Sequence, residues 1–480
     1  MRDLFDLEEI LQVLNGFNPW WTQPDVAVPA FRRLAFHATR SYLEKNDLRR
    51  AILLSGPRRV GKTTVLQQLA RQAIDDGSEA RSVLYLSLDH PVLKLLSLRK
   101  ILALYHAHIH AVGRPALLLL DEVQYAADWQ TEVKLLVDHQ PDYRIVATGS
   151  ASVVQKDQLA ESGTGRWLTI PVPTLSFYEF IHIRSEAVPA IDETILPTDL
   201  FTMSGADLLR IASQLRPLLP LFDRYLLTGG FPETARQEDI SFSQRLLRED
   251  VVERVLKRDM TSLFGVRNVN DLERLFLYVC LHTGNILAHN TLARDLGTSA
   301  ATVANYLELL RSANLLYCLP PAGLSGKKIL RARNKYYLVD AGLRNAVLLR
   351  GEQTLLRPDE MGMIAETTVL RHLYAYYYRD TPQIVYWRDA LTEKEVDIIV
   401  KSPAYHLAFE VKYREKANIE AKSGLAIYSA AERLETAYLI TKQETDFGVT
   451  ELPGQATRFL RVPAHVLCYL LGQAERMLWG

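Results

Sequence analysis

The sequence predicts a multidomain α/β protein, and three observations lead to this prediction. The chain has 480 residues, more than an ordinary single domain, so two to four domains are expected. Between Arg50 and about Ile170, short apolar runs alternate with helical stretches, which is typical of a parallel sheet with crossover helices. From Gly362 onward, a helical stretch precedes several short apolar runs, and this order predicts a second α/β unit.

The composition indicates an ordinary soluble protein. Hydrophobic residues make up 48% and charged residues 23%, and 56 basic residues balance 56 acidic ones. With no net charge, any nucleic-acid contact must come from a local basic patch. Cys280, Cys318 and Cys468 lie far apart and fit neither a disulfide framework nor a metal site, which indicates a reducing compartment. The acidic N-terminus has no signal-peptide pattern and no apolar run is long enough for a bilayer, so we expect a cytoplasmic location and no membrane contact.

A nucleotide-binding loop follows the first predicted strand. Residues 56–64 read GPRRVGKTT and fit the pattern G-x-x-x-x-G-K-[ST], between a strand-like run and an amphipathic helix. Glycines let backbone N–H groups surround a phosphate, and the helix adds its positive N-terminal dipole. The alternative is a plain glycine turn with an exposed lysine. We expect ATP to contact Gly56, Arg58, Arg59, Val60, Gly61, Lys62, Thr63 and Thr64.

Polar residues at the ends of two later strands complete the predicted ATP site. Asp121 and Glu122 follow four apolar residues at 117–120, so Asp121 is expected to join Thr63 at Mg²⁺ and Glu122 to polarise the attacking water. A buried strand ending in an acidic helix cap is the alternative. The strand at 144–148 ends in Thr148, which we expect to help position that water.

The motifs resemble a known family. GPRRVGKTT, LLLLDEVQ, RIVATGS, the Gly165-Arg166 pair before PVPTLSFYEF, and TGGFPE at 228–233 are similar to prokaryotic AAA+-type ATPases whose C-terminal part was catalogued as a domain of unknown function. The resemblance spans roughly residues 30 to 440. It implies ATP hydrolysis, a homo-oligomer, commonly a ring, and an arginine supplied by a neighbouring subunit. Arg166 is the first candidate for that arginine and Arg58 the second; either can equally be a structural ion-pair residue.

A winged helix with a basic wing is predicted in the middle of the chain. Residues 290–297 and 300–310 form the two helices of a helix-turn-helix pattern, with Thr302, Asn305 and Arg311 on the outer side. The following basic tract is expected to contact DNA phosphates. The alternative is a winged helix that packs between protein modules. The predicted DNA-binding residues are Lys327, Lys328, Arg331, Arg333 and Lys335.

The C-terminal part carries a second predicted metal site. Asp397 precedes a strand that bears Glu410 and Lys412, and this spacing resembles the PD-(D/E)xK nucleases. Asp397 and Glu410 are expected to hold Mg²⁺ or Mn²⁺, with Lys412 orienting water. Glu366 resembles the extra acidic ligand of the members similar to Holliday-junction resolvases. Two alternatives stay open: ordinary charged strand residues, or a fold that binds branched DNA without cutting it.

These predictions divide the chain into five parts. We expect an N-terminal extension at 1–30, an AAA+ P-loop core at 31–180, a helical lid or linker at 181–270, a winged helix at 271–345 and a restriction-endonuclease-like α/β domain at 346–480. The expected function is ATP-dependent binding and remodelling of DNA, including branched DNA, with metal-dependent cleavage by the last domain. The rival function is a nucleotide switch in signalling or defence, whose distal domains bind proteins.

Overall fold

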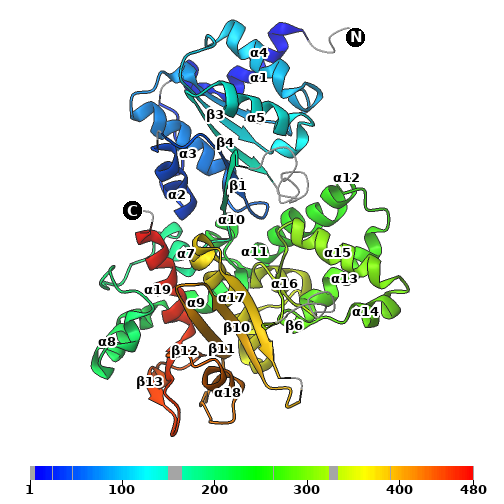
Figure 1. Cartoon of the computed structure of the whole chain (residues 1–480). Coiled ribbons are helices and arrows are strands. Elements are labelled where there is room, and N and C mark those ends of the chain that lie inside the picture. Colours follow the sequence, from blue (N-terminus) through cyan, green and yellow to red (C-terminus); the bar gives the residue numbers. More distant parts are fainter. Residues whose placement is uncertain are drawn as a thin grey trace. The chain divides into compact units, whose positions relative to one another are not determined.

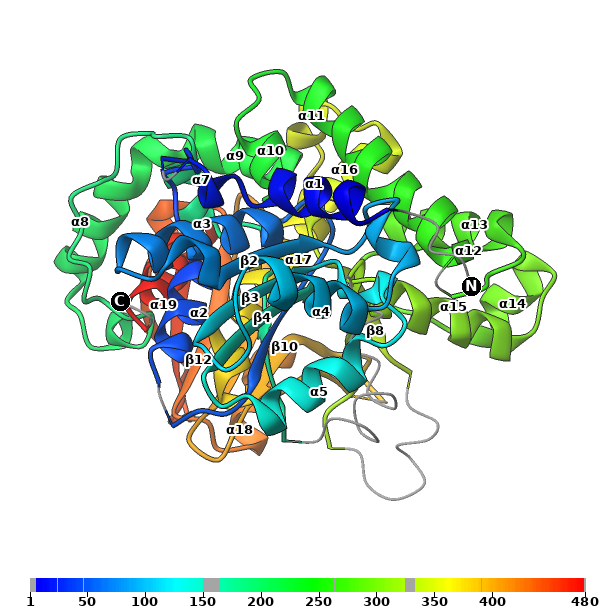
Figure 2. The same ribbon diagram turned by 90° about the horizontal axis from the view of Figure 1, so that it is seen from above.

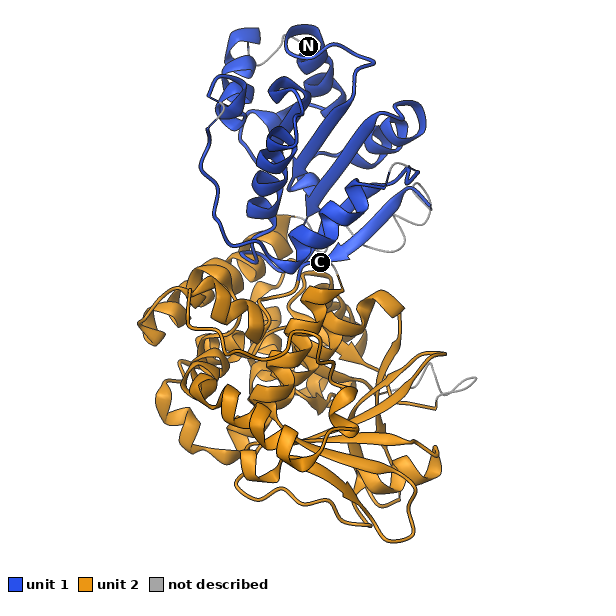
Figure 3. Ribbon diagram, turned by 90° about the vertical axis from the view of Figure 1, so that its left-hand side faces the viewer, with its two compact units in different colours: residues 1–172, 479 blue, residues 173–478, 480 orange. Residues whose placement is uncertain are grey.

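The chain folds into two compact units, residues 1–172 and 173–478 (Figure 3). The structure, a computed structural model, describes residues 6–23, 25–45, 47–149, 165–262, 264–323, 333–389 and 391–478. Among these residues, no helix is long and apolar enough to cross a membrane.

The first unit contains the predicted parallel sheet. Within the described residues the strand order is β2-β3-β4-β1-β5, and every neighbouring pair is parallel. The apolar runs that predicted the strands are buried on both faces, as a sheet covered by helices on both sides requires. The strands are β1 (Ala51–Ser55), β2 (Val83–Ser87), β3 (Ala116–Asp121), β4 (Tyr143–Gly149) and β5 (Trp167–Pro171).

Helices cover both faces of this sheet. Leu53, Leu118 and Leu120 pack in one apolar cluster with residues of α1, α4 and α5, whereas the buried face of α3 lies outside that cluster. In the view from above, α3 and α5 run along opposite sides of the strands (Figure 2). The helices are α1 (Leu7–Phe17), α2 (Leu34–Leu43), α3 (Lys62–Asp75), α4 (Leu98–His108) and α5 (Trp129–His139), with a short turn η4 (Val123–Tyr125) after β3.

The second unit begins with a group of helices that pack against the C-terminal ones. Residues from Pro173 onward belong to this unit, so the segment predicted as a lid or linker at 181–270 is compact with the C-terminal part. The nitrogen Nη2 of the buried Arg371 donates to the Thr174 carbonyl oxygen. The elements are α7 (Phe177–Ile183), α8 (Gly205–Leu215), α9 (Leu219–Thr228), α10 (Pro232–Ala235), α11 (Ile240–Leu247), the π-helix η8 (Arg248–Asp259) and α12 (Met260–Ser262).

The described part of the middle of the chain contains three helices and a small sheet. Gly297 ends the first helix of the pattern in the left-handed region (φ 69°), and the Ser299 side chain caps the second by accepting the Thr302 N–H. The described strands have the order β6-β8-β7. The elements are α13 (Val269–Leu281), β6 (Asn285–Ile286), α14 (His289–Leu296), α15 (Ala300–Ser312), β7 (Leu316–Leu319) and β8 (Lys335–Leu338).

A mixed sheet and long helices form the C-terminal part (Figure 1). Within the described residues the strand order is β13-β14-β12-β11-β10-β9, with β11, β12 and β14 parallel and the other pairs antiparallel. The predicted second α/β unit is therefore present. The elements are α16 (Ala341–Leu348), α17 (Pro358–Tyr377), β9 (Gln383–Arg388), β10 (Glu395–Lys401), β11 (His406–Lys412), α18 (Gly424–Ala431), β12 (Thr436–Thr441), β13 (Gly448–Glu451), β14 (Arg458–Pro463) and α19 (Ala464–Met477).

The two glycines of the motif at 228–233 surround a buried carboxylate. The side chain of Asp340 accepts the Gly230 N–H at 2.9 Å and the Gly342 N–H at 2.8 Å. A Cβ atom on Gly229 would lie 2.0 Å from the Asp340 carboxylate, and its φ of 74° also favours glycine. The motif is therefore explained by packing around Asp340 in the core of the second unit.

Candidate functional site

The loop between β1 and α3 has a backbone that requires glycine at two positions. A Cβ atom on Gly56 would lie 2.0 Å from the Val172 carbonyl oxygen, so no larger residue fits there. Gly61 has a φ of 91°, in the left-handed region, directly before the first residue of α3. The two glycines of the predicted pattern therefore fix the path of the loop into the helix N-terminus.

Lys62 is held inside this loop. The Lys62 side chain is buried, and its Nζ atom donates to the Gly56 carbonyl oxygen at 2.9 Å and the Pro57 carbonyl oxygen at 2.7 Å. The outer side of the loop is fixed by the buried Arg33, whose guanidinium donates to the Val60 carbonyl oxygen at 2.6 Å. A cation thus lies at a helix N-terminus, where backbone N–H groups and the helix dipole favour an anion.

Three hydroxyl groups converge on the carboxylate of Asp121. Thr63 donates to Oδ2 at 2.7 Å, Tyr85 donates to Oδ2 at 2.9 Å, and Thr148 donates to Oδ1. The parallel register explains the convergence, because Asp121 lies opposite Ser87, and Thr148 lies opposite Leu54 at the same edge of the sheet. The structure therefore brings the predicted residues Thr63, Asp121 and Thr148 together.

The environment of Asp121 suits a bound cation. Burial raises the pKa of Asp121 and the neighbouring Glu122 raises it further, while the hydrogen bonds from Thr148, Thr63 and Tyr85 lower it. A hydroxyl and a carboxylate within hydrogen-bonding distance are the hard oxygen ligands that Mg²⁺ prefers. Thr63 and Asp121 therefore fit the magnesium site predicted for the bound nucleotide.

Glu122 is oriented by two neighbours. Its backbone has a φ of 55°, and its N–H donates to the Thr148 hydroxyl at 3.1 Å. The Gln124 amide donates to the Glu122 carboxylate. Thr148 thus links the backbone of Glu122 to the side chain of Asp121, which couples the two acidic residues to β4.

Two contributors to this site were missed in the sequence, Tyr85 and Gln124. Tyr85 is two residues before Ser87 on β2, on the sheet face that it shares with Asp121 on β3. Finding it requires knowing that β2 and β3 are neighbours, which the sequence does not state. Gln124 lies two residues after Glu122, and this short spacing could have indicated that the two side chains are in contact.

The candidate arginines both have contacts within their own chain. The Arg166 Nε atom donates to the Asp138 carboxylate at 2.7 Å, and both side chains are about one-third exposed. The Arg58 guanidinium donates to the Tyr125 hydroxyl at 3.1 Å. Arg166 is thus in an ion pair within its own chain, and its role in a neighbouring subunit stays a prediction.

The predicted ligands of the second metal site lie on the neighbouring strands β10 and β11. The register of β10 and β11, with Ile398 opposite Phe409, brings Asp397 beside Glu410 when continued by one residue. Glu410 pairs with the Lys412 ammonium at 2.9 Å, whereas Asp397 accepts the Val411 N–H at 2.8 Å.

A further lysine, Lys335, lies next to two of the predicted ligands. Asp397 and Glu366 both face Lys335, at 3.6 and 3.5 Å from its Nζ atom. Within the part of the chain that the structure describes, no group of three or more acidic, histidine or cysteine side chains could hold a metal ion. Lysines therefore pair with the predicted ligands, and the assignment of Asp397, Glu410 and Glu366 to a metal stays a prediction.

The predicted DNA-binding tract is only partly described. Lys327, Lys328 and Arg331 lie outside the described residues. Arg333 is exposed, and its carbonyl oxygen accepts the Tyr386 hydroxyl at 2.6 Å. Lys335 is 2% exposed and lies among carboxylates, so its assignment as a phosphate contact is corrected.

The outer side of α15 carries little uncompensated positive charge. Val303, Tyr306 and Leu310 are buried on the inner side of the helix. On the outer side, Asn305 is exposed, and the exposed Arg311 pairs with Glu308 at 2.6 Å. Thr302 hydrogen-bonds Ser299 at 2.9 Å at the start of the helix.

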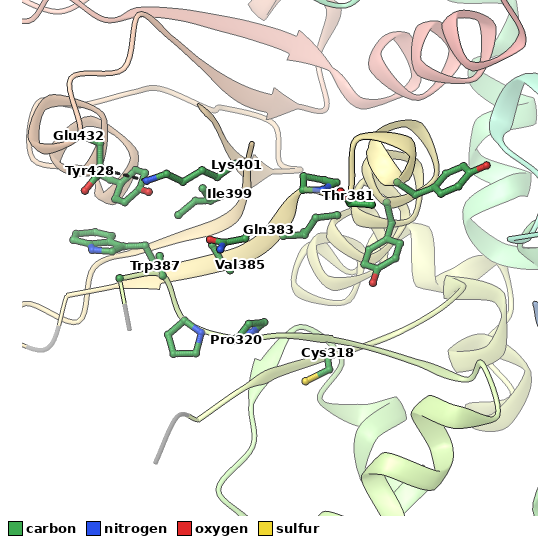
Figure 4. Close-up of a pocket in the computed structure, with 17 residues that line it drawn as sticks. Cys318, Pro320, Thr381, Gln383, Val385, Trp387, Ile399, Lys401, Tyr428 and Glu432 are labelled. Carbon is green, nitrogen blue, oxygen red and sulfur yellow. Dashed lines mark ion pairs between the residues drawn. The ribbon is translucent and has the colours of Figure 1, made fainter. Parts of the chain in front are cut away.

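A separate cavity of about 930 Å³ lies in the second unit (Figure 4). Trp387 and Tyr428 line it together with Pro320, Cys318 and an ion pair between Lys401 and Glu432 at 3.9 Å. No residue of either predicted site is among its lining residues. The cavity is therefore distinct from the loop of Lys62 and from the carboxylates around Lys335.

Comparisons with known proteins identify relatives over most of the chain. It is 24% identical over 380 residues to an uncharacterized protein of Haemophilus influenzae, covering 78% of this chain and 85% of that protein. It is 27% identical over 308 residues to an uncharacterized protein of Methanocaldococcus jannaschii, covering 62% of each. An uncharacterized protein of Mycobacterium tuberculosis is 26% identical over 366 residues, with 75% of this chain and 70% of that protein covered.

Solved structures match only weakly. AMPPCP-bound DnaA from Aquifex aeolicus has 17% identity and a TM-score of 0.25, covering 62% of this chain and 92% of that one. Cdc6p from Pyrobaculum aerophilum has 15% identity and a TM-score of 0.25, with 76% and 96% covered. TM-scores this low carry no argument about fold or function.

Family profiles match three successive segments. Residues 48–181 match a profile described as an AAA domain. Residues 219–354 and 361–462 match two profiles described as domains of unknown function, DUF8612 and DUF4143. The first segment contains Lys62, Asp121 and Glu122. The N-terminal part of the chain therefore has a P-loop α/β fold that is similar to AAA domains, and the rest of the chain matches two domains of unknown function.

Proposed function

We propose that this chain binds and hydrolyses ATP at the carboxyl edge of the parallel sheet. The observation that carries the proposal is the convergence of Thr63, Thr148 and Tyr85 on Asp121, beside the loop that holds Lys62. Lys62 would bind the β- and γ-phosphates, and Thr63 and Asp121 would hold Mg²⁺. The bound Mg²⁺ would neutralise charge on the phosphates.

The hydrolytic step is assigned to the residues that follow β3 and β4. Glu122 accepts a proton from the attacking water, and Thr148 helps to position that water. The hydrogen bond between the Glu122 N–H and Thr148 supports a shared role, because it keeps the two residues in one geometry. Arg58, Arg59, Val60 and Thr64 contribute to the nucleotide pocket as parts of the loop and of the first helical turn.

We further propose that the ATPase acts on DNA through the middle module. The order of α13, β6, α14, α15, β7 and β8, with the strand order β6-β8-β7, supports a winged helix. The basic residues Lys327, Lys328, Arg331 and Arg333 supply its phosphate contacts. Cleavage of DNA is not part of this proposal, because lysines compensate the C-terminal carboxylates.

The pairing of Arg311 favours a second candidate function. Because Arg311 pairs with Glu308 and Lys335 is buried among carboxylates, neither side chain offers an uncompensated charge to DNA. The module would then bind a protein, and the chain would be a nucleotide switch.

One titration separates these two functions. Steady-state ATP hydrolysis is measured with duplex, single-stranded and four-way-junction DNA. A DNA-directed ATPase is stimulated by at least one form, and the stimulation falls as salt rises. Turnover that is indifferent to all three forms favours the protein-binding switch, and no turnover contradicts the ATPase.

We also propose that copies of the chain assemble so that Arg166 of one subunit reaches the ATP of the next. Its partial exposure supports this role, because the guanidinium can exchange Asp138 for a phosphate. The weak ion pair expected between exposed side chains makes this exchange inexpensive in free energy.

A further inference from the structure

A buried lysine from β8 reaches the carboxylates of the C-terminal part. The Lys335 side chain is 3% exposed, and its ammonium forms ion pairs with Glu395, with Glu366 at 3.5 Å and with Asp397 at 3.6 Å. Glu395 and Asp397 lie on β10, and Glu366 lies on α17. Three acidic side chains from two elements therefore surround one ammonium group.

Aromatic side chains hold this ammonium in place. The Tyr337 hydroxyl donates to the Glu366 carboxylate at 2.6 Å and accepts from the Lys335 ammonium at 3.4 Å. The rings of Tyr337 and Tyr386 lie with their centroids 5.9 and 5.6 Å from Nζ, within the range of cation–π attraction. The lysine is thus fixed by charge, hydrogen bonding and ring contacts.

The charge of the lysine is stable in this environment. Burial by itself lowers the pKa of Lys335, but attraction by Glu366, Asp397 and Glu395 more than offsets the burial and raises the pKa above its ordinary value. The side chain is therefore a permanent cation in the neutral pH range. It supplies the positive charge that a cluster of three carboxylates requires.

A divalent cation does not fit the same place. Mg²⁺ binds carboxylate oxygens at about 2.1 Å and Mn²⁺ favours similar ligands, so either ion needs the space and the charge that the ammonium takes. The remaining predicted ligand, Glu410, already pairs with Lys412. We propose that Lys335 is the resident cation of Glu366, Glu395 and Asp397, which makes this cluster an ionic joint between β8 and the C-terminal sheet instead of a metal centre.

The joint has a structural consequence within the second unit. β8 pairs with β6 and β7, so Lys335 ties that three-stranded sheet to β10 of the six-stranded sheet. Removing the ammonium would leave three partly buried carboxylates repelling one another, which is strongly unfavourable. A divalent cation supplied from solution could then replace it.

Mn²⁺ binding to the nucleotide-free protein tests this proposal, measured by electron paramagnetic resonance together with the thermal unfolding midpoint. Wild type and Asp397→Asn should bind the same amount of Mn²⁺, because the cluster takes none. Lys335→Met should unfold at a lower temperature, and Mn²⁺ should restore much of the loss. Asp397→Asn added to Lys335→Met should abolish that restoration.

Lys401→Met is the matched control, because Lys401 is an exposed lysine of β10. It should keep both the wild-type midpoint and the wild-type Mn²⁺ binding. Mn²⁺ binding by wild type that Asp397→Asn removes would overturn the proposal. A Lys335→Met protein as stable as wild type would overturn it as well. If Lys335→Met fails to fold, the comparison of wild type with Asp397→Asn still decides.

Discussion

Asp121 illustrates at the residue scale how one carboxylate organises the proposed ATP site. It accepts hydrogen bonds from Thr63, Tyr85 and Thr148, which come from a helix and two strands. Each bond offsets part of the cost of burying a charge, and the cation of a bound nucleotide would offset the rest. In the proposed mechanism, Asp121 holds the cation and Glu122, directly after it, accepts the proton.

The first prediction concerns Glu122. Glu122→Gln keeps the size of the side chain and removes its ability to accept a proton, so ATP should bind with near wild-type affinity. Hydrolysis should slow by about 10²- to 10⁴-fold, the usual contribution of a general base. Nucleotide binding by calorimetry and phosphate release report the two effects. Wild-type turnover in the variant would assign the base to another residue.

Residue by residue, the sequence predicted contacts within motifs and missed contacts between elements. Thr63 and Asp121 belong to motifs whose spacing carries their chemistry, and they meet as predicted. Tyr85 and Lys335 carry no motif, because their roles depend on which strand lies beside which. A lysine in a basic tract predicts a surface position. Lys335 is buried instead, because it pairs with three carboxylates that are distant in the sequence.

At the scale of elements, apolar runs and capping residues determine much of the observed order. The runs at 51–55 and 116–120 become buried strands, and Ser299 begins a helix as its side chain predicts. The sequence did not reveal that α7 is hydrogen-bonded to α17. That contact depends on His372, whose Nδ1 donates to the Thr368 carbonyl oxygen while Nε2 accepts the Phe177 N–H at 2.9 Å.

The second prediction concerns the pH dependence of this contact. Burial holds the pKa of His372 well below its ordinary value. In mildly acidic solution, His372 therefore binds a proton in the unfolded chain but not in the folded chain. The contribution of His372 to the free energy of unfolding should therefore be complete above about pH 6.5. Below that pH it should fall by about 1.4 kcal/mol per pH unit.

His372→Gln isolates this contribution. The glutamine oxygen can accept the Phe177 N–H but binds no proton, so its urea unfolding curves between pH 7 and 5 should show a shallower pH slope than wild type. The free energy of unfolding at pH 7 should change little, whereas its dependence on pH should change clearly. An unchanged slope would show that the acid sensitivity of the second unit arises elsewhere.

At the scale of the whole molecule, the chain combines an AAA-type domain with two domains of unknown function. Length and the alternation of strands and helices predicted more than one α/β unit, and the structure has two compact units, each with a sheet and helices. The assembly of copies is a proposal that rests on the resemblance to AAA+ proteins and on the exposure of Arg166. No property of a single chain reveals how subunits are arranged, because a residue at a subunit boundary looks like any other exposed residue.

The third prediction tests whether Arg166 acts between subunits. Lys62→Ala and Arg166→Ala should each be inactive alone. In mixed assemblies, an Arg166→Ala subunit keeps an intact loop and receives Arg166 from its Lys62→Ala neighbour, so part of the ATPase activity should return.

A mixture of Lys62→Ala with Glu122→Gln is the matched control, because neither subunit has an intact ATP site. It should stay inactive. Mixed assemblies of Lys62→Ala and Arg166→Ala that form but show no activity would assign Arg166 to its ion pair with Asp138 or to a role in its own chain.

The most direct test of the ATP site is the affinity of Lys62→Ala for a non-hydrolysable ATP analogue with Mg²⁺, measured by calorimetry. Removing the cation buried in the loop should weaken binding by about 2–5 kcal/mol, roughly 30-fold to several thousand-fold. Lys94→Ala, at an exposed lysine of the same unit, should bind as wild type does. Equal affinity in Lys62→Ala and wild type would contradict the assignment of this loop to ATP.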